Sequence, residues 1–363
     1  MKFRPPPMQP AFSGTGHLAV WVAALAGILL SPVLTALIVS PETRYLVMSK
    51  RVGPSDWHTN QVLRETAPLD ILVLGNSRML MAINHATLRE NVHGPDGPLK
   101  SETIAARFNG YDLSYTFLRD FFVHRHARLV VINYPDIPQI DNHPGEKYIR
   151  ALGEPDPGLD IKTPSLAITD YAEMALIGPR LALASVIRPG SLTRQGYRTM
   201  EDFPDFERTR GSWTPDEGYE ESKTSPREPF VQYDSPNKPE PAIIIRRGEP
   251  LPAGVVLTDR ALTPIESAYL PAIKALCEKN GAVLAFMQLP MANSEGPVEI
   301  SRQVLALGAP IIAASSEMMF GNISAERIKE NYYDHLHFNS NGSRRSAEVF
   351  GPALQALLQQ TRG

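Results

Sequence analysis

Short apolar runs alternate with helical patterns along most of the chain, and this alternation limits the possible folds more than any other feature. The runs are rich in branched residues, as buried parallel strands are. They are Asp70–Leu74, Thr103–Phe108, Arg128–Asn133, Ala282–Gln288 and Ala309–Ala314. Strand and helix in repeated succession predict an open parallel sheet covered on both faces, a three-layer α/β/α fold.

Two helices are predicted in the second half of the chain. The amphipathic stretch Leu262–Asn280 is followed by Gly281, a suitable C-cap, and Ser343–Gln360 closes the chain after a turn-prone segment. Cys277 lies in the apolar pattern of the first of these helices, so we expect a buried free thiol. A single cysteine excludes an intramolecular disulfide framework and a zinc site built on cysteine pairs.

A run of 23 residues without a charge, Leu18–Ser40, precedes this region. About 20 apolar residues suffice for a helix to cross a bilayer, whereas the apolar part of a cleaved signal peptide has only about 7–15. The run is therefore predicted to be an uncleaved, single-pass anchor in the inner membrane. Lys2 and Arg4 lie in a short tail that is easily left in the cytoplasm, so we expect the large domain on the extracytoplasmic (periplasmic) side.

The predicted organisation is a cytoplasmic tail at 1–17, the anchor at 18–40, a linker at 41–69 and an α/β domain at 70–363. Within that domain, residues 201–250 hold 8 prolines and 19 charged residues. We expect an irregular insertion at about 200–255, because such a segment has too little apolar surface for its own core. Its aromatic residues either hold the loop on the domain or line a sugar-binding surface. The net charge of −3 argues against a dedicated nucleic-acid binder.

The first candidate site follows the first predicted strand and reads Gly75-Asn76-Ser77-Arg78. A tight turn there places Ser77 at the carboxyl edge of the sheet, where ligands of such sheets bind, and at the start of a helix whose free N–H groups favour a developing negative charge. A serine at this position is also an ordinary N-cap. The motifs GxSxG, GxxxxGK[ST] and GxGxxG are absent, so no usual phosphate-binding loop or cofactor site is expected.

The second candidate lies just before the last helix, where Asp334 and His337 are three residues apart in a short loop. The carboxylate can reach one imidazole nitrogen while the other faces outward, which is the arrangement that activates a weakly nucleophilic serine. The alternatives are a polar loop that caps the helix and a metal site using His335 and His337. No third ligand cluster is evident, so no metal is expected.

Together with Asn109-Gly110 after the second strand, these motifs resemble those of the SGNH/GDSL hydrolase superfamily. The anchor and the run ILVLGNSRMLMAINHATL are similar to membrane-anchored SGNH-like proteins of cell-envelope acylation, one of which acts in D-alanylation of lipoteichoic acid. The resemblance implies an SGNH, flavodoxin-like sheet. It implies the roles of nucleophile for Ser77, base for His337 and orienting carboxylate for Asp334. The N–H groups of Ser77 and Gly110 would form the oxyanion hole.

The sequence departs from this family in two places. Asn76 stands where GDSL has aspartate, and the usual G-x-N-D block is missing after the third strand, where Asn133 is the candidate for the missing amide donor. Loss of one oxyanion donor costs about 10²–10³ in turnover. We expect a serine esterase or O-acyltransferase that acts, through an acyl-serine intermediate, on acyl groups of a cell-envelope or secreted polysaccharide. Acetyl is the expected acyl group, and a membrane-bound O-acyltransferase is the expected partner. The alternative is an inactive SGNH-like protein that binds glycan or such a partner.

Overall fold

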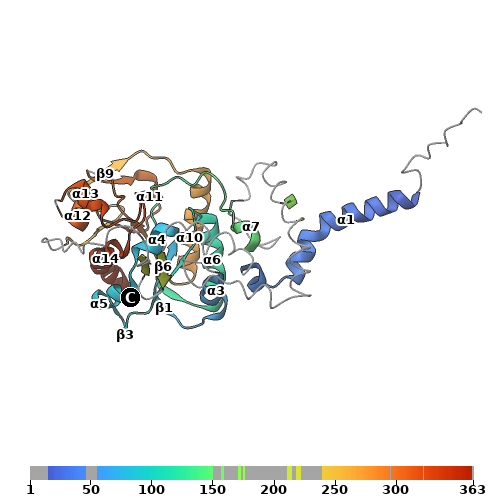
Figure 1. Ribbon diagram of the computed structural model, residues 1–363, viewed down its shortest axis with the longest axis horizontal. Coiled ribbons are helices and arrows are strands. Elements are labelled where there is room, and N and C mark those ends of the chain that lie inside the picture. Colours follow the sequence, from blue (N-terminus) through green and yellow to red (C-terminus); the bar gives the residue numbers. More distant parts are fainter. Residues whose placement is uncertain are drawn as a thin grey trace, which may run out of the picture.

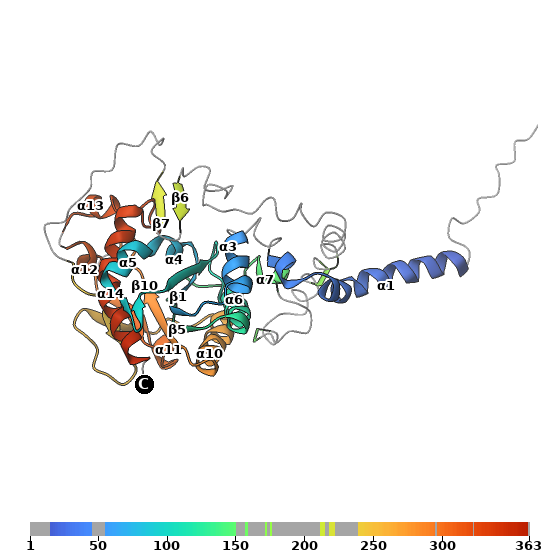
Figure 2. The same cartoon turned by 90° about the horizontal axis from the view of Figure 1, so that it is seen from below.

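The computed structural model describes residues 15–45, 55–149, 239–294, 296–321 and 323–361, with the short pieces 157–158, 171–172, 175, 211–214 and 218–221. Its central sheet has the strand order β4-β1-β5-β10-β12-β8. Strand β1 is labelled in Figure 1, and β1, β5 and β10 are labelled in Figure 2. These strands are β1 (Leu69–Gly75), β4 (Ser101–Ala105), β5 (Ala127–Asn133), β8 (Ile243–Ile245), β10 (Val283–Gln288) and β12 (Ile311–Ala313). All neighbours pair in parallel except β8, which runs antiparallel to β12. The predicted parallel sheet is thus confirmed, with an antiparallel strand added at one edge.

Alternate residues of each central strand enter two separate cores. In β1, Leu72 and Leu74 belong to one core, while Ile71 and Val73 belong to the other. Figure 2 shows α6 and α10 on one side of the sheet and α5 and α14 on the other. Two cores on opposite faces make three layers, as the strand and helix alternation predicted. The helices are α4 (Ser77–Ala82), α5 (His85–Asn91), α6 (Tyr111–His124), α10 (Pro264–Lys279) and α14 (Ser340–Gln360).

Short elements complete the α/β unit. Strands β9 and β11 pair in parallel, while β2 with β3 and β6 with β7 form antiparallel pairs. The remaining elements are α3 (Ser55–Thr59), η1 (Asn60–Arg64), β2 (His93–Gly94), β3 (Gly97–Pro98), α7 (Glu146–Ile149), β6 (Gly211–Thr214), β7 (Gly218–Glu221), β9 (Val255–Thr258), β11 (Val298–Ser301), α11 (Arg302–Ala306), α12 (Ser316–Phe320) and α13 (Ala325–Lys329).

Most predicted element ends agree with the structure. Helix α10 begins at a capping box of Thr263 and Glu266, and Gly281 adopts a φ of +69° just after its end. Cys277 is buried in this helix, as expected, and burial raises the pKa of its thiol to about 12. Strand β4 ends at Ala105 rather than at residue 108, because the chain turns there and Phe108 is exposed with a φ of +63°.

Two predicted loops contain regular structure. The Pro-rich segment 201–250 includes the β6–β7 hairpin and also β8, whose Ile245 is buried in the main core. The predicted linker 41–69 includes α3 and η1, in which His58 and Val62 are fully buried. His58 contacts the Phe117 ring of α6 at a centroid distance of 5.0 Å, so α3 and η1 belong to the α/β unit.

The N-terminal helix α1 (Thr15–Ile38) covers most of the uncharged run and extends away from the α/β unit (Figures 1 and 2). Its large apolar side chains are exposed, among them Leu18, Trp21 and Leu37. Among the described residues, no helix meets the combined length and hydropathy requirements of a membrane span. Residues 1–14 and the side chains at 32 and 34–36 lie outside the described part.

Candidate active site

The turn that carries Ser77 is held by its neighbours on both sides. Asn76 caps α4, because its Oδ1 accepts hydrogen bonds from the N–H groups of Arg78 (3.0 Å) and Met79 (3.3 Å). A Cβ at Gly75 would lie 2.6 Å from Oδ1 of Asn133 and 2.9 Å from Cγ of Met79, so the close turn favours glycine. Ser77 therefore stands at the carboxyl end of β1 with its side chain partly exposed.

Ser77, His337 and Asp334 form a continuous hydrogen-bonded chain. The Oγ of Ser77 lies 2.8 Å from Nε2 of His337, and Nδ1 of His337 lies 2.8 Å from Oδ2 of Asp334. A proton on Nδ1 donates to the carboxylate and leaves Nε2 as the acceptor for the serine hydroxyl. The structure thus brings together the three residues that the motifs selected as a triad.

The Asp334 carboxylate is stabilised in its ionised form. Partial burial disfavours the charge, but the hydrogen bond and charge of His337 and the N–H groups of Leu336 and His337 outweigh it and lower the pKa of Asp334 to about 2. Asp334 is consequently an anion throughout the neutral range, as a residue that orients an imidazole must be.

The loop that carries Asp334 and His337 is anchored at its end. Phe338 is buried and contacts Tyr332 at a ring distance of 4.6 Å, and the N–H of Tyr333 donates to the carbonyl of His337 (2.7 Å). Asn339 caps α14 by accepting hydrogen bonds from the N–H groups of Asn341 and Gly342, so the last helix begins earlier than the turn-prone sequence predicted.

The predicted oxyanion donors occupy two kinds of position. Gly110 is the N-cap residue of α6, and in the described part of the chain neither its N–H nor that of Ser77 donates a hydrogen bond. Asn133 is buried behind the turn, where its Nδ2 donates to Oη of Tyr111 (2.9 Å). The structure shows no hydrogen bond between Asn133 and Ser77, so its predicted role as a third donor stays a prediction.

The side chain of Asn109 connects the turn after β1 to the segment after β5. The side-chain amide of Asn76 donates to Oδ1 of Asn109, and Nδ2 of Asn109 donates to the carbonyl of Ile137 (2.8 Å). This bridge also accounts for asparagine at position 76, since an aspartate there has no N–H to donate. Asn109 belongs to the motif Asn109-Gly110, but no role of its side chain was predicted from the sequence.

A buried ion pair, not predicted from the sequence, involves the residue that follows the serine. Arg78 is 5 % exposed; its Nη1 lies 2.5 Å from Oδ2 of Asp136, and its Nη2 donates to the carbonyl of Leu289 (2.6 Å). This guanidinium ties the turn after β1 to the segments after β5 and β10. A pairing of residues 58 positions apart leaves no local pattern in the sequence.

The alternative metal site receives no geometric support. His335 is exposed, and its backbone carbonyl accepts a hydrogen bond from the N–H of Ala292 (3.1 Å). The described residues contain no group of three or more His, Cys, Asp or Glu side chains that could hold a metal ion.

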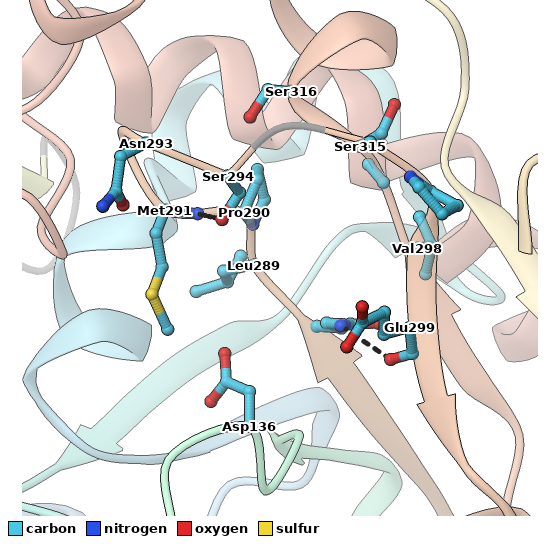
Figure 3. A pocket seen from close by; sticks show the side chains of 14 residues that line it. Asp136, Leu289, Pro290, Met291, Asn293, Ser294, Val298, Glu299, Ser315 and Ser316 are labelled. Atoms are coloured by element: carbon cyan, nitrogen blue, oxygen red, sulfur yellow. Dashed lines mark hydrogen bonds between the residues drawn. The ribbon is translucent and has the colours of Figure 1, made fainter. Parts of the chain in front are cut away.

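A polar cavity of about 320 Å³ opens at the carboxyl edge of the sheet (Figure 3). Asp136 points into it from the segment after β5, and Leu289 and Pro290 line it after β10. The same edge therefore carries both the hydrogen-bonded triad and a cavity, which is where ligands of open parallel sheets bind.

Comparisons with known protein families, with curated proteins and with solved structures find no match.

Proposed function

We propose that this protein is a serine esterase or O-acyltransferase that works through an acyl-serine intermediate. The proposal rests on one observation, the hydrogen-bonded chain from Ser77 through His337 to an ionised Asp334. A serine whose hydroxyl proton has an acceptor within hydrogen-bond distance, with that acceptor oriented by a carboxylate, is arranged for nucleophilic attack on an acyl carbonyl.

In the proposed first half-reaction, Nε2 of His337 takes the hydroxyl proton while Oγ of Ser77 bonds to the acyl carbonyl carbon. The carbonyl oxygen becomes an oxyanion that the N–H groups of Ser77 and Gly110 stabilise. The intermediate then collapses, the bond to the leaving alcohol breaks, and His337 gives its proton to that alcohol oxygen.

In the second half-reaction, His337 deprotonates an acceptor hydroxyl, whose oxygen attacks the acyl carbonyl carbon. The bond from that carbon to Oγ of Ser77 then breaks, and His337 returns the proton to Oγ. Water as acceptor makes the protein an esterase, and a sugar hydroxyl makes it an O-acyltransferase. We propose a polysaccharide of the cell envelope or a secreted polysaccharide as the substrate and acetyl as the acyl group. A membrane-bound O-acyltransferase is the proposed partner, since it supplies acyl groups at the bilayer.

We further propose an SGNH, flavodoxin-like fold and a membrane anchor. The strand order supports the first, because the parallel strands, counted along the chain, occupy the order 2-1-3-4-5. The 23 uncharged residues Leu18–Ser40 support the second. The anchor keeps the α/β unit at the extracytoplasmic face of the inner membrane, within reach of a membrane acyl donor.

Labelling with a fluorophosphonate tests the chemistry, because the probe forms a phosphorus–oxygen bond only with an activated serine. We expect labelling and hydrolysis of 4-nitrophenyl acetate by the native protein, and loss of both in Ser77→Ala. In His337→Ala both should fall by about 10²-fold or more. His335→Ala is the matched control and should retain both, because its side chain is exposed and, among the described residues, only its backbone carbonyl accepts a hydrogen bond.

The control histidine also separates the alternatives. Equal loss from His335→Ala and His337→Ala, together with sensitivity to a chelator, would favour a metal site. An unlabelled, inactive native protein that still binds glycan or an acyltransferase would favour the non-catalytic role.

A further inference from the structure

The cavity at the carboxyl edge of the sheet, here called the edge cavity, is connected by three contacts to the segments that carry Ser77 and His337. Arg78, the residue after Ser77, bonds to Asp136 and to the carbonyl of Leu289, and both of these residues line the cavity. Near the loop that carries Asp334 and His337, here called the histidine loop, Oη of Tyr332 donates to the carbonyl of Pro290 (3.0 Å), another lining residue. The edge cavity is therefore connected to the reacting serine through Arg78, the next residue in the chain.

The edge cavity contains buried polar atoms without a partner. Ser316 is only 6 % exposed, and its hydroxyl makes no hydrogen bond among the described residues. Figure 3 shows this hydroxyl turned toward the side on which Asn293 lies. Oε1 of Gln288 is likewise buried and unpaired, while Nε2 of the same side chain donates to the carbonyl of Glu299 (3.1 Å). Buried polar groups are normally hydrogen-bonded, so two unpaired ones in one cavity indicate a ligand that supplies the partners.

The polar atoms that line the edge cavity, paired and unpaired, indicate which groups a ligand must supply. The amide oxygen of Gln288 only accepts hydrogen bonds, as do the carboxylates of Asp136 and Glu299, whereas the Ser316 hydroxyl both donates and accepts. The lining residues that the structure describes include no Lys, Arg or His. A ligand that offers several O–H donors and carries no negative charge matches this lining. An anionic ligand would meet two carboxylates with only Arg78, already bonded to Asp136, in opposition.

We propose that the edge cavity binds the hydroxyl groups of an uncharged carbohydrate next to the acyl ester, and that it selects neutral glycans over uronate-containing or phosphate-containing ones. This inference rests on the proposed function and narrows its substrate class. The volume of about 320 Å³ lies near the lower end of the range for small-molecule sites, about 300–1,000 Å³. The cavity thus holds a short segment of the chain rather than a long one.

Binding to the Ser77→Ala protein tests the proposal without any turnover. The whole chain of 363 residues, solubilised in detergent, is titrated with partially acetylated xylo-oligosaccharides and, separately, with partially acetylated oligomannuronate of equal length. We expect the neutral oligosaccharide to bind at least tenfold more tightly. Equal affinity for the two, or preference for the mannuronate, would overturn the proposal.

Ser316→Ala and Ser346→Ala form a matched pair on the Ser77→Ala background. Ser346 is also buried with an unpaired hydroxyl, but it lies in α14 and does not line the edge cavity. We expect Ser316→Ala to weaken binding of the neutral oligosaccharide about three- to tenfold, the effect of one lost hydrogen bond, and Ser346→Ala to leave it within about twofold. Equal effects of the two substitutions would reject the assignment of Ser316. Thermal unfolding of both variants checks that neither result comes from lost stability.

Charge reversal gives a third readout. Glu299 is exposed at the rim, so Glu299→Lys should fold normally and should improve binding of the mannuronate at least threefold. No improvement would show that lining charge does not determine the choice of glycan.

Kinetics on the native background separate this inference from the proposed function. Ser316→Ala should raise KM for the acetylated xylo-oligosaccharide, whereas Ser346→Ala, outside the cavity, should leave that KM within about twofold. Binding as expected without any esterase activity would sustain the edge cavity and reject the chemistry. Activity that depends on Ser77 but is indifferent to Ser316 and Glu299 would reject the edge cavity and sustain the chemistry.

Discussion

Ser77 Oγ and His337 Nε2 lie 2.8 Å apart although 260 residues separate them along the chain. Ser77 directly follows an asparagine that caps a helix, and His337 lies two residues before another such asparagine. Asn76 accepts two backbone N–H groups at the start of α4, and Asn339 accepts two at the start of α14. The positions of the serine and the imidazole therefore depend on the same local chemistry, a side-chain amide oxygen at a helix N-terminus.

Asp334→Asn should lower kcat for 4-nitrophenyl acetate by about 10²- to 10⁴-fold with little loss of stability. The amide oxygen can still accept the N–H groups of Leu336 and His337, but an amide does not stabilise a protonated imidazole as a carboxylate does. Steady-state kinetics and thermal unfolding of the same preparation provide the check. Because the pKa of Asp334 is about 2, its ionisation should contribute no inflection to the pH profile above about pH 3. An Asn variant with native kcat would mean that Asp334 only shapes the loop.

Asn76→Asp, which restores the residue of the GDSL motif, should reduce kcat/KM about three- to tenfold instead of improving it. Aspartate keeps the two cap hydrogen bonds of α4 but loses the donor to Asn109. Asn76→Ala loses both functions and should also destabilise the fold by about 1 kcal/mol. Measurements of activity and urea unfolding distinguish the two effects, and an Asp variant with higher activity would contradict the role given to the bridge.

Arg78→Ala should destabilise the protein by about 3–5 kcal/mol, because it leaves the mostly buried Asp136 carboxylate without its countercharge. Urea unfolding measures this cost. Lys274→Ala is the control: its partner Glu278 is 60 % exposed at the (i, i+4) position of a helix, and such pairs contribute about 0.3–0.5 kcal/mol. The double variant Arg78→Ala/Asp136→Ala should recover part of the loss. Equal effects at residues 78 and 274 would show that burial of the first pair does not matter.

The comparison of the sequence with the structure shows which contacts can be predicted from local sequence. Ser77, Asp334 and His337 were predictable because each lies in a short motif at a strand end or a helix start. Arg78 with Asp136 was not, because their contact depends on the spacing of β1 and β5 in the sheet. Strand β8 was missed because three isoleucines between prolines and charges resemble a loop until β12 is available to pair with them.

Folding stability should fall as the pH is lowered from about 6.5 to about 4, because of His58. Burial lowers the pKa of His58 to about 4, and the charge of His143 adds to this, while the hydrogen bond to the Ala105 carbonyl opposes it. Between these pH values the unfolded chain binds a proton that the folded protein does not, so each pH unit removes up to about 1.4 kcal/mol. The total loss of folding stability from His58 is on the order of 3 kcal/mol. Burial also lowers the pKa of His143, so protonation of His143 acts on stability in the same direction.

His58→Gln should remove most of that pH dependence, since glutamine does not titrate and its amide can still donate to the Ala105 carbonyl. Urea unfolding at pH 7.5 and pH 5 measures it in the native protein and the variant. His124→Gln is the control, because His124 is exposed at the end of α6. If the native protein and His58→Gln lose stability equally on acidification, groups other than His58 cause the pH dependence of folding stability.

The Pro-rich insertion should be needed for the natural substrate but not for the fold. Its β6–β7 hairpin contacts α4, the helix that starts at Ser77, and α14, the helix that follows the histidine loop (Figure 2). An element in that position can form a wall over the acyl site or a surface for a partner. A deletion of residues 201–238 should therefore keep Tm within a few degrees and keep the hydrolysis of 4-nitrophenyl acetate, because closing a shorter loop costs slightly less entropy.

The same deletion should abolish activity on the acetylated polysaccharide or binding of a partner in a pull-down. A longer deletion, residues 201–250, gives the contrast, because it also removes β8, which pairs with β12 and buries Ile245. We expect this longer deletion to lower Tm strongly, since loss of a buried aliphatic residue alone costs about 2–5 kcal/mol. If the shorter deletion retains both natural functions, the insertion is a passive connection. If it unfolds the protein as the longer one does, the hairpin belongs to the core.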